Sequence, residues 1–334
     1  MTTNCAFLEN ELMDVVRLFK TRPTEIQHIY RYENGVFFND FVIDGESFFF
    51  KDSGQVCNEL EFKRLERRFA KLALYAILSE KYKEEMPWGA LTGIRPTKLA
   101  YTEIEKGMDF RPLFEKMRVS KQNTELVARI LKAQEGIYEK KDGNVDLFVS
   151  IPFCPTKCAY CSFITAPIEK TRQFLPDYLS ALSREIEESK PLIKNLRSIY
   201  IGGGTPFALS VSELERVLKP LDSLANVEYT VEAGRPDVFT REKLALLKEH
   251  GVTRICINPQ TFSDETLQKI GRKHTVADVY KAFEMIDGFG FDVNVDLIAG
   301  LEGETVETFA RGVEKAVQTG AENITVHCLS LKAG

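Results

Sequence analysis

Asp146-Leu-Phe-Val-Ser-Ile-Pro-Phe-Cys-Pro-Thr-Lys-Cys-Ala-Tyr-Cys161 is the stretch of the 334-residue chain that decides its fold. Its first six residues read as a strand, and the loop behind the strand carries cysteines in the pattern C-x3-C-x2-C. Three thiolates on one tight loop can hold three irons of a cubane iron–sulfur cluster. Cys154, Cys158 and Cys161 are therefore the predicted metal ligands, and the fourth iron remains free to accept an external chelating group.

The other four cysteines do not extend this site. Seven cysteines are an odd number and only three of them cluster, so a disulfide framework does not fit. A tetrahedral structural zinc site would need a fourth ligand, and the sequence has no second C-x2-C and no H-x3-H. We interpret Cys256 and Cys328 as ordinary strand cysteines.

From residue 146 onward the sequence repeats a strand, a loop and a helix. Six consecutive units of this kind predict a parallel sheet with right-handed helical crossovers, and hence an α/β fold. A capping box at Ser212 and Glu215 predicts the start of one helix. The predicted strands are Asp146–Ile151, Arg197–Ile201, Val227–Glu232, Arg254–Asn258, Phe291–Ile298 and Asn323–Leu329.

Polar and apolar residues divide between the two faces of these strands. Successive residues point to opposite sides of a strand, and one parity is apolar, as in Val227, Tyr229 and Val231. Burying the polar parity without partners would cost roughly a few kcal/mol per group. We therefore expect a partial, TIM-like (β/α)6 barrel over residues 145–334 around an open, wet, ligand-holding cleft, the alternative being a solvent-exposed face of an open sheet. The polar residues include Ser150, Ser198, Glu228, Thr230, Glu232, Arg254, Asn258, Gln260, Asp292, Asn294, Asp296, Thr325 and His327.

The N-terminal part of the chain has a different pattern. Apolar runs separated by Asn-Gly at 34–35 and Asp-Gly at 44–45 predict a three-stranded β-meander, because these dipeptides accept the positive φ angles of tight hairpins. Helical spacing of apolar residues follows over residues 59–82 and again over Thr124–Tyr138, where Ile137 belongs to the expected apolar face. These elements predict a smaller α+β domain over residues 1–140, in which the strands come first and the helices follow.

The composition argues against two classes of partner. With 44 Lys and Arg against 49 Asp and Glu, the formal charge is −5, so no overall basic field attracts nucleic acid. No apolar run reaches the roughly 20 residues that a membrane span needs, and the first residues lack the basic start of a signal peptide. We predict a cytoplasmic protein without a nucleic-acid or membrane partner.

Several strings of residues together resemble a known family. Ile-Pro-Phe-Cys-Pro at 151–155, Tyr-Ile-Gly-Gly-Gly-Thr-Pro at 200–206 and Val-Asp-Leu-Ile-Ala-Gly-Leu at 295–301 resemble the oxygen-independent coproporphyrinogen III oxidase family, which belongs to the radical S-adenosylmethionine (SAM) superfamily. Trp-Gly-Ala-Leu-Thr-Gly-Ile-Arg-Pro-Thr-Lys at 88–98 and Glu-Ala-Gly-Arg-Pro-Asp at 232–237 resemble its coproporphyrinogen dehydrogenase branch, called HemZ-type.

The resemblance implies a [4Fe-4S] cluster and SAM as cofactors. In the superfamily, SAM chelates the free iron, and an electron from the cluster cleaves its sulfonium to give a 5′-deoxyadenosyl radical. For any single residue a structural role is the alternative: a β-α turn for the glycines, a salt bridge or cap for the acids, and a solvated loop position for the arginine. The residues that match SAM-contacting positions are Phe148, Tyr160, Gly203, Gly204, Thr205, Glu232, Gln260, Arg272, Asp296 and Ser330.

Two features depart from the family pattern. The family usually has Tyr-x-His in the first strand, where this chain has Phe148 and Ser150, so contacts of that hydroxyl and imidazole are missing. The family also continues into a C-terminal domain that helps to close over the substrate. Because this sequence stops at Gly334, directly after the sixth strand, we expect it to be a truncated chain.

The activity that the resemblance implies is oxidative decarboxylation in haem and porphyrin biosynthesis. Two propionates of coproporphyrinogen III would become vinyl groups, giving protoporphyrinogen IX, with a low-potential electron donor such as flavodoxin or ferredoxin. Arg95 and Lys98 are candidates for holding substrate carboxylates. The alternatives are a haem-binding chaperone of the same family and another radical SAM enzyme that modifies a tetrapyrrole.

Overall fold

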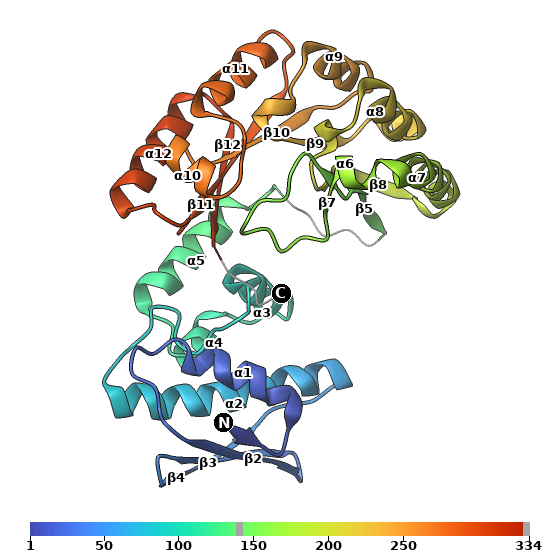
Figure 1. Ribbon diagram of the computed structural model, residues 1–334. Coiled ribbons are helices and arrows are strands. Elements are labelled where there is room, and N and C mark those ends of the chain that lie inside the picture. The colour runs from blue at the N-terminus through green and yellow to red at the C-terminus, as the bar shows by residue number, and fades with distance from the viewer. Residues whose placement is uncertain (138–142, 330–334) are drawn as a thin grey trace. The chain divides into compact units, whose positions relative to one another are not determined.

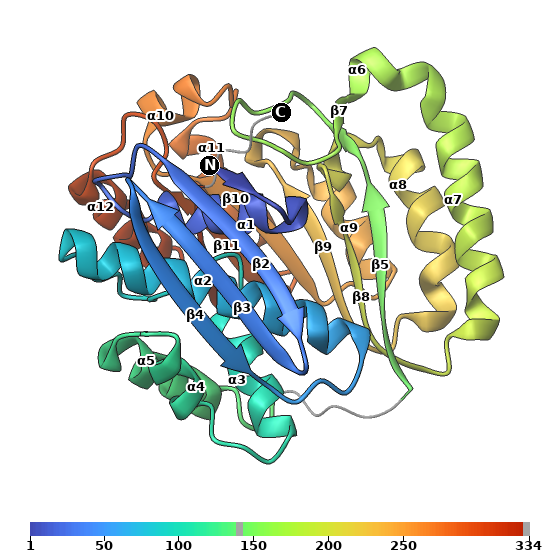
Figure 2. The same cartoon turned by 90° about the horizontal axis from the view of Figure 1, so that it is seen from below.

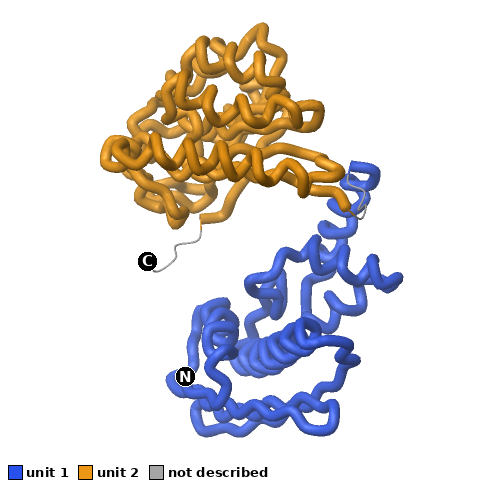
Figure 3. Tube along the Cα trace, turned by 90° about the vertical axis from the view of Figure 1, so that its right-hand side faces the viewer, with its two compact units in different colours: residues 1–139 blue, residues 140–334 orange. Residues whose placement is uncertain are grey.

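The structure is a computed structural model that describes residues 1–137 and 143–329. The chain divides into two compact units, residues 1–139 and residues 140–334 (Figure 3). Each unit has a hydrophobic core of its own and is described by itself. None of the helices in the described ranges combines the length and the apolar character that crossing a bilayer demands.

Unit 1 contains a sheet with the strand order β1-β2-β3-β4 (Figure 2). The predicted meander is confirmed: β2, β3 and β4 are antiparallel neighbours. All four residues of the two hairpin turns have positive φ, between 50° and 86°, as the expected turn type requires. The two-residue β1 adds a parallel partner to β2. The strands are β1 (Thr2–Thr3), β2 (Ile26–Glu33), β3 (Val36–Ile43) and β4 (Glu46–Ser53).

Helices pack against this sheet, and the first of them was not predicted. Residues 6–16 form α1, a helix that the expected three-stranded meander did not include. Leu8, Leu12 and Val15 recur at helical spacing and are fully buried, which is the signal that the prediction missed. The helices of unit 1 are α1 (Ala6–Val16), α2 (Glu59–Tyr82), α3 (Pro96–Glu105), α4 (Arg111–Lys116) and α5 (Lys121–Ala133).

The predicted bounds of α5 were also wrong. The helix begins earlier because the Ser120 side chain accepts a hydrogen bond from the backbone N–H of Asn123 and caps the first turn. It ends earlier because the chain turns at Gly136, whose φ is +77°. Ile137 therefore lies beyond the helix and is 77% exposed, instead of belonging to its apolar face.

Unit 2 is a curled parallel sheet with helices on its outer face (Figure 1). The strand order β12-β11-β10-β9-β8-β5 follows the chain without interruption, and every adjacent pair is parallel, which confirms the predicted partial barrel. A short parallel pair, β6 and β7, flanks the cysteine loop. The strands are β5 (Asn144–Ile151), β6 (Phe153–Cys154), β7 (Ala166–Pro167), β8 (Asn195–Gly203), β9 (Glu228–Gly234), β10 (Arg254–Gln260), β11 (Asp292–Ala299) and β12 (Asn323–Cys328).

The helices of unit 2 follow the strands as predicted, with one shifted start. The capping box of α8 is formed by Ser210 and Glu213 instead of Ser212 and Glu215, because Ser210 is the last residue with extended backbone. Short 3₁₀ turns lie at Arg172–Phe174, Lys190–Leu192, Pro206–Ala208, Lys219–Leu224 and Pro236–Val238. The α-helices are α6 (Ile168–Thr171), α7 (Leu175–Ser189), α8 (Val211–Leu218), α9 (Arg241–Glu249), α10 (Asp264–Lys269), α11 (Val276–Ile286) and α12 (Val306–Gln318).

The core of unit 2 lies between the sheet and these helices. The apolar parity of the strands supplies it, including Ile199, Tyr229 and Val231, each completely buried. Since alternate residues of a strand face opposite sides, the polar parity is turned toward the concave face of the sheet. The division of faces that the sequence predicted is therefore the division that the structure has.

Candidate functional site

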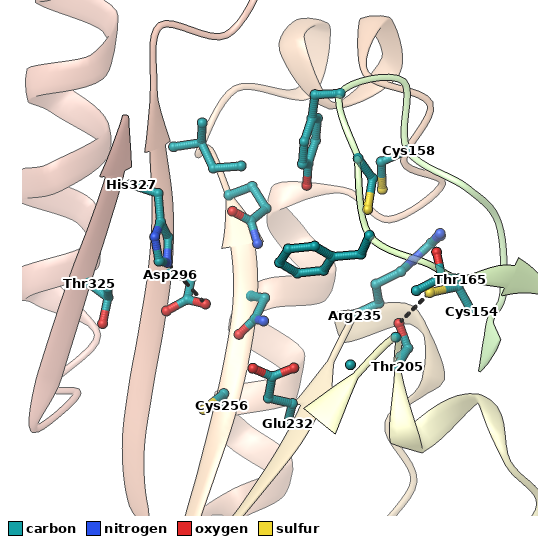
Figure 4. Close-up of a pocket in the computed structure, with 18 of the residues that line it drawn as sticks. Cys154, Cys158, Thr165, Thr205, Glu232, Arg235, Cys256, Asp296, Thr325 and His327 are labelled. Carbon is teal, nitrogen blue, oxygen red and sulfur yellow. Dashed lines mark hydrogen bonds and ion pairs between the residues drawn. The ribbon is translucent and has the colours of Figure 1, made fainter. Parts of the chain in front are cut away.

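A cleft of about 610 Å³ opens on the polar face of the sheet in unit 2 (Figure 4). This volume lies within the range of about 300–1,000 Å³ typical of small-molecule sites. Residues of the polar parity line it along β9, β10, β11 and β12, and the cysteine loop lines one end. The cleft runs along the concave face from the first residues of β9 and β10 to the carboxyl ends of the strands, the end where the active sites of such barrels are found.

The three predicted metal ligands, Cys154, Cys158 and Cys161, all line this cleft as free cysteines. The loop that carries them is held by backbone hydrogen bonds at several points. Its start pairs with β7, and Ala159 N–H donates to the carbonyl of Ile270 at 3.1 Å. These bonds hold the loop against neighbouring elements of unit 2, so the cysteines are positioned by the fold.

The local chemistry of the thiols fits a cubane cluster. Burial raises the pKa of Cys154, and the neighbouring Cys158 and Cys161 raise it further, whereas a hydrogen bond from Thr205 lowers it. In the described residues no three His, Cys, Asp or Glu side chains converge closely enough to hold a single metal ion. A cubane makes no such demand, because each thiolate binds a different iron. The donor set therefore fits a cluster better than a mononuclear zinc site.

The glycine run at the end of β8 brings two backbone segments together. Gly203 has a φ of +107°, which side chains other than hydrogen rarely permit. At Gly204, N–H donates to the carbonyl of Ile151, and the next residue, Thr205, donates from its N–H to the carbonyl of Phe153 at 2.7 Å. The end of β8 is thereby joined directly to the residues that precede Cys154.

Gly204→Ala is expected to destabilise the chain by about 1–3 kcal/mol, the usual cost of overpacking, and to reduce iron retention. The added Cβ would lie 2.5 Å from the Phe153 carbonyl oxygen and 2.8 Å from that of Ile151, so the cysteine loop must shift. Chemical denaturation and an iron assay measure the two effects.

Gly312→Ala is the matched control, because its nearest neighbour would lie 3.9 Å away and it sits inside α12. Alanine is favoured over glycine in a helix by about 0.5–1 kcal/mol, so this variant should be slightly more stable and should keep its iron. If both variants lost iron equally, the contact of Gly204 with the loop would not be the cause.

Acidic side chains lie along the middle of the cleft. Tyr200 donates a hydrogen bond from its hydroxyl to the Glu232 carboxyl, and His327 Nε2 lies 3.7 Å from Asp296 Oδ2 (Figure 4). Burial raises the pKa of Glu232, against the hydrogen bond from Tyr200, and the charge of Asp296 adds to the rise. Two carboxyls in one cleft suit a ligand that brings positive charge.

Several buried polar atoms of the cleft have no hydrogen-bond partner within the described structure. Among them Gln260 is distinctive, because its φ is +69° and the register of β10 shifts between Ile257 and Gln260. Such a backbone conformation is unfavourable for a non-glycine residue and is found where a side chain is aimed at a ligand. Burying a polar atom without a hydrogen-bond partner costs free energy, unless a ligand or a water molecule supplies that partner. The atoms concerned are Arg254 Nε, Asn258 Oδ1, Gln260 Oε1 and Arg272 Nε.

Two arginines fasten the cysteine loop to the sheet. Arg272 donates to the Tyr160 hydroxyl at 3.2 Å and to the backbone carbonyl of Asn258. Arg235, only 2% exposed, donates to the Thr156 hydroxyl in the loop and makes a two-pronged ion pair with Asp237. Arg272 therefore links the loop to β10 itself, and Arg235 links it to the turn that follows β9.

The structure brings most of the predicted SAM-contacting residues into this one cleft. Phe148 is outside its described lining: it is 60% exposed and stacks on Tyr200 with ring centroids 6.0 Å apart. Ser330 lies outside the described residues. The roles assigned to all of these residues remain predictions. Those that line the cleft are Tyr160, Gly203, Gly204, Thr205, Glu232, Gln260, Arg272 and Asp296.

Sequence reasoning missed other residues of the lining. Tyr200 has the same parity as Ser198 in β8, so the alternation of that strand was a signal that it faces the cleft. Arg235 and Thr165 lie outside any periodic segment, and no pattern in the sequence indicates that they meet the loop. Cys256 lines the cleft as an ordinary buried strand residue, and burial raises its thiol pKa to about 12.

Comparison with known proteins gives matches to one superfamily. A family model described as the radical SAM superfamily matches residues 148–316, about half of the chain. The oxygen-independent coproporphyrinogen-III oxidase-like protein HemZ of Bacillus subtilis is 38% identical over 266 residues, covering 73% of this chain and 52% of that protein. The heme chaperone HemW of the same organism is 39% identical over 192 residues, covering 54% of this chain and 49% of its own.

A solved structure supports the same relationship. Coproporphyrinogen III oxidase (HemN) from Escherichia coli, a radical SAM enzyme, matches with a TM-score of 0.51 and 26% identity over 55% of this chain and 44% of the other. The chain spans about half the length of the curated relatives reported above.

Proposed function

This chain belongs to the radical SAM superfamily, and from that premise we propose that it carries out oxygen-independent oxidative decarboxylation of coproporphyrinogen III. Two propionate side chains would each lose CO₂ and become vinyl groups, giving protoporphyrinogen IX. The observation that carries the proposal is the extent of the match to the HemZ protein. Unit 2 has 195 of the 334 residues, so a match over 73% of the chain includes part of unit 1 as well.

Members of the superfamily bind a [4Fe-4S] cluster and SAM. When bound, these cofactors supply a 5′-deoxyadenosyl radical that removes a hydrogen atom from the substrate. In this chain Cys154, Cys158 and Cys161 would hold the cluster, and the cleft residues described above would hold SAM. A low-potential flavodoxin or ferredoxin suits the need for an electron donor, and the cytoplasm suits the need for reduced thiols.

The residues of the cleft have separable tasks in this proposal. Glu232 and Asp296 provide negative charge for the ammonium group of SAM, since charge-assisted hydrogen bonds are the strong ones. Gly203 and Gly204 let backbone atoms approach the cofactor without a Cβ in the way. Arg272 orients Tyr160, whose ring lines the cleft beside the cysteine loop.

We expect SAM binding to weaken as the pH falls, because protonation removes the negative charge of Glu232. Since the pKa of this carboxyl is raised, the loss should begin above the ordinary glutamate value of about 4.3. Glu232→Gln should bind SAM about tenfold more weakly or worse at neutral pH and should show less pH dependence. Equilibrium binding of SAM to cluster-loaded protein across a pH series measures this.

Glu249→Gln serves as the control, because Glu249 is an exposed residue at the end of α9 and lies outside the lining of the cleft. It should bind SAM as the unaltered chain does at each pH. An equal pH dependence in Glu232→Gln and the unaltered protein would show that another group controls binding.

A heme chaperone is the second candidate, and the match to HemW favours it because its identity of 39% over 192 residues is as high as the 38% of the HemZ match over 266 residues. Anaerobic incubation of the cluster-loaded chain with SAM, a reductant and coproporphyrinogen III distinguishes the two. A vinyl product supports the proposal. Formation of 5′-deoxyadenosine without a vinyl product contradicts the substrate, stoichiometric haem binding without SAM turnover indicates the chaperone, and a methylated tetrapyrrole indicates a different radical SAM reaction.

A further inference from the structure

A cavity of about 280 Å³ lies within unit 1 and shares no lining residue with the cleft of unit 2. It is lined by side chains of α2 and α3 and by the segment that joins them, with Glu11 contributed by α1. Seven Lys or Arg residues and three Glu residues line it, which gives a local formal charge of +4 in a chain whose total is −5. The sign of this cavity is thus opposite to that of the protein.

Three of the cations already neutralise the three acids. Glu11 pairs with Lys71 and lies 3.7 Å from Arg67. Lys106 lies 3.5 Å from both Glu61 and Glu103. Lys71, whose side chain is 4% exposed, also donates to the carbonyl oxygen of Thr92 at 3.0 Å. Each acid of the lining therefore has a cation within ion-pair distance.

Four cations of the lining make no ion pair with any described residue: Arg64, Arg68, Arg95 and Lys98. Arg68 is the least exposed of the four. Burial lowers its pKa, the charge of Glu103 opposes this, and the like charge of Arg64 lowers the pKa further, with a smaller opposing effect of Glu61. Holding these positive groups together costs free energy that a bound anion would recover.

The backbone at the cavity has the same polarity. Arg95 is the N-cap residue of α3, a helix of 10 residues with no side-chain cap and no acidic residue in its first turn. The first N–H groups of a helix lack intrahelical partners, and the helix dipole is positive at that end. Pro96 at the first position has no N–H, so the contribution of this helix end is its dipole; Gly93, Arg95 and Lys98 of this end belong to the lining.

We propose that this cavity is a binding site for a small ligand with adjacent phosphate groups, either free pyrophosphate or the phosphate tail of a nucleotide. Pockets for drug-sized ligands usually measure at least about 300 Å³. This cavity is slightly smaller, so a compact, highly charged ligand fits it best. Arginine forks match phosphate oxygens in pairs, and three of the four unpaired cations are arginines. In this proposal Arg95 and Lys98 bind phosphate, in place of the substrate carboxylates that the family resemblance suggested for them.

Calorimetric titration of the full chain with pyrophosphate, ADP and citrate, without divalent metal, tests the proposal. Saturable binding of pyrophosphate at one site is expected. Comparable affinity for ADP would identify the diphosphate as the recognised group, and at least tenfold tighter binding of ADP would identify a nucleotide. Binding of citrate in preference to both phosphates would overturn the phosphate assignment in favour of a carboxylate ligand, and absence of binding by all three would overturn the site.

The double variant Arg95→Ala/Lys98→Ala should weaken pyrophosphate binding at least tenfold, and both residues are exposed enough for folding to be retained. Lys51→Ala/Arg129→Ala removes the same two charges from exposed positions of unit 1 outside the cavity and should change the affinity less than twofold. Equal weakening in the two variants would reduce the effect to general electrostatics and overturn the site. Arg68→Met, checked for folding by circular dichroism, should also lose affinity.

A thermal melt provides a second readout. Pyrophosphate should raise the melting temperature of the unaltered chain more than sodium chloride of equal ionic strength, because a specific ligand stabilises the folded state that binds it. Equal stabilisation by the two salts would contradict specific binding. The Cys158→Ala chain should respond to pyrophosphate as the unaltered chain does, which separates this site from the cluster.

Discussion

Cys158→Ala is expected to abolish cluster binding and, with it, all cleavage of SAM. Only three thiolates are available in the loop, and each would bind its own iron. Two cannot keep the cube in place against loss to solvent. Iron should fall from about four atoms per chain to fewer than about one after anaerobic reconstitution, and 5′-deoxyadenosine should become undetectable by chromatography.

Cys57→Ala is the matched control, because Cys57 is an exposed cysteine of unit 1 and has no place in the cleft. Its iron content and its SAM cleavage should equal those of the unaltered chain. Retention of the full iron content by Cys158→Ala, or replacement of iron by one zinc per chain in the unaltered protein, would contradict the cluster assignment on which the proposed function depends.

Arg272→Met is expected to slow SAM cleavage by at least about tenfold and to shift the cluster to a lower reduction potential. Burial lowers the pKa of Arg272, but Tyr160 and Cys158 raise it above its ordinary value, so the guanidinium stays charged beside the loop. Methionine fills similar space without that charge. Reduction adds negative charge to the cluster, and the loss of a nearby cation disfavours the reduced state.

Lys273→Met removes the same charge from the next residue, which is exposed and absent from the lining of the cleft. Water screens that charge, so potential and rate should be unchanged. A spectroscopic redox titration measures the potential, and quantified 5′-deoxyadenosine gives the rate. If Arg272→Met kept the original potential while losing rate, the residue would act through the position of Tyr160 alone.

Strand parity predicted the barrel well because it reports a local property. Glu232 and Asp296 stand on the polar parity of their strands and line the cleft, whereas Gln260 lines it from beyond the register shift that interrupts the alternation of β10. A period of two survives in the sequence whatever the tertiary context. The start of α8 was harder, since Ser210 and Ser212 each begin a similar capping pattern and only the backbone distinguishes them.

Contacts between distant segments could not be predicted in this way. Arg235 meets Thr156 across 79 positions of the chain, and no local pattern carries that information. The cavity of unit 1 is a similar case. The sequence pattern predicts a solvent-exposed helix face for Arg64, Arg67 and Arg68. Only the tertiary structure brings these residues of α2 and Arg95 together in the lining of one cavity.

The two hydrogen bonds that join Gly204 and Thr205 to the backbone before Cys154 have a thermodynamic consequence. A segment proposed to contact SAM and the segment that would carry the cluster cannot change conformation separately. Binding of SAM should therefore favour binding of the cluster, and binding of the cluster should favour binding of SAM. The amount of cluster that the chain retains at equilibrium with an iron chelator should accordingly be greater when SAM is present.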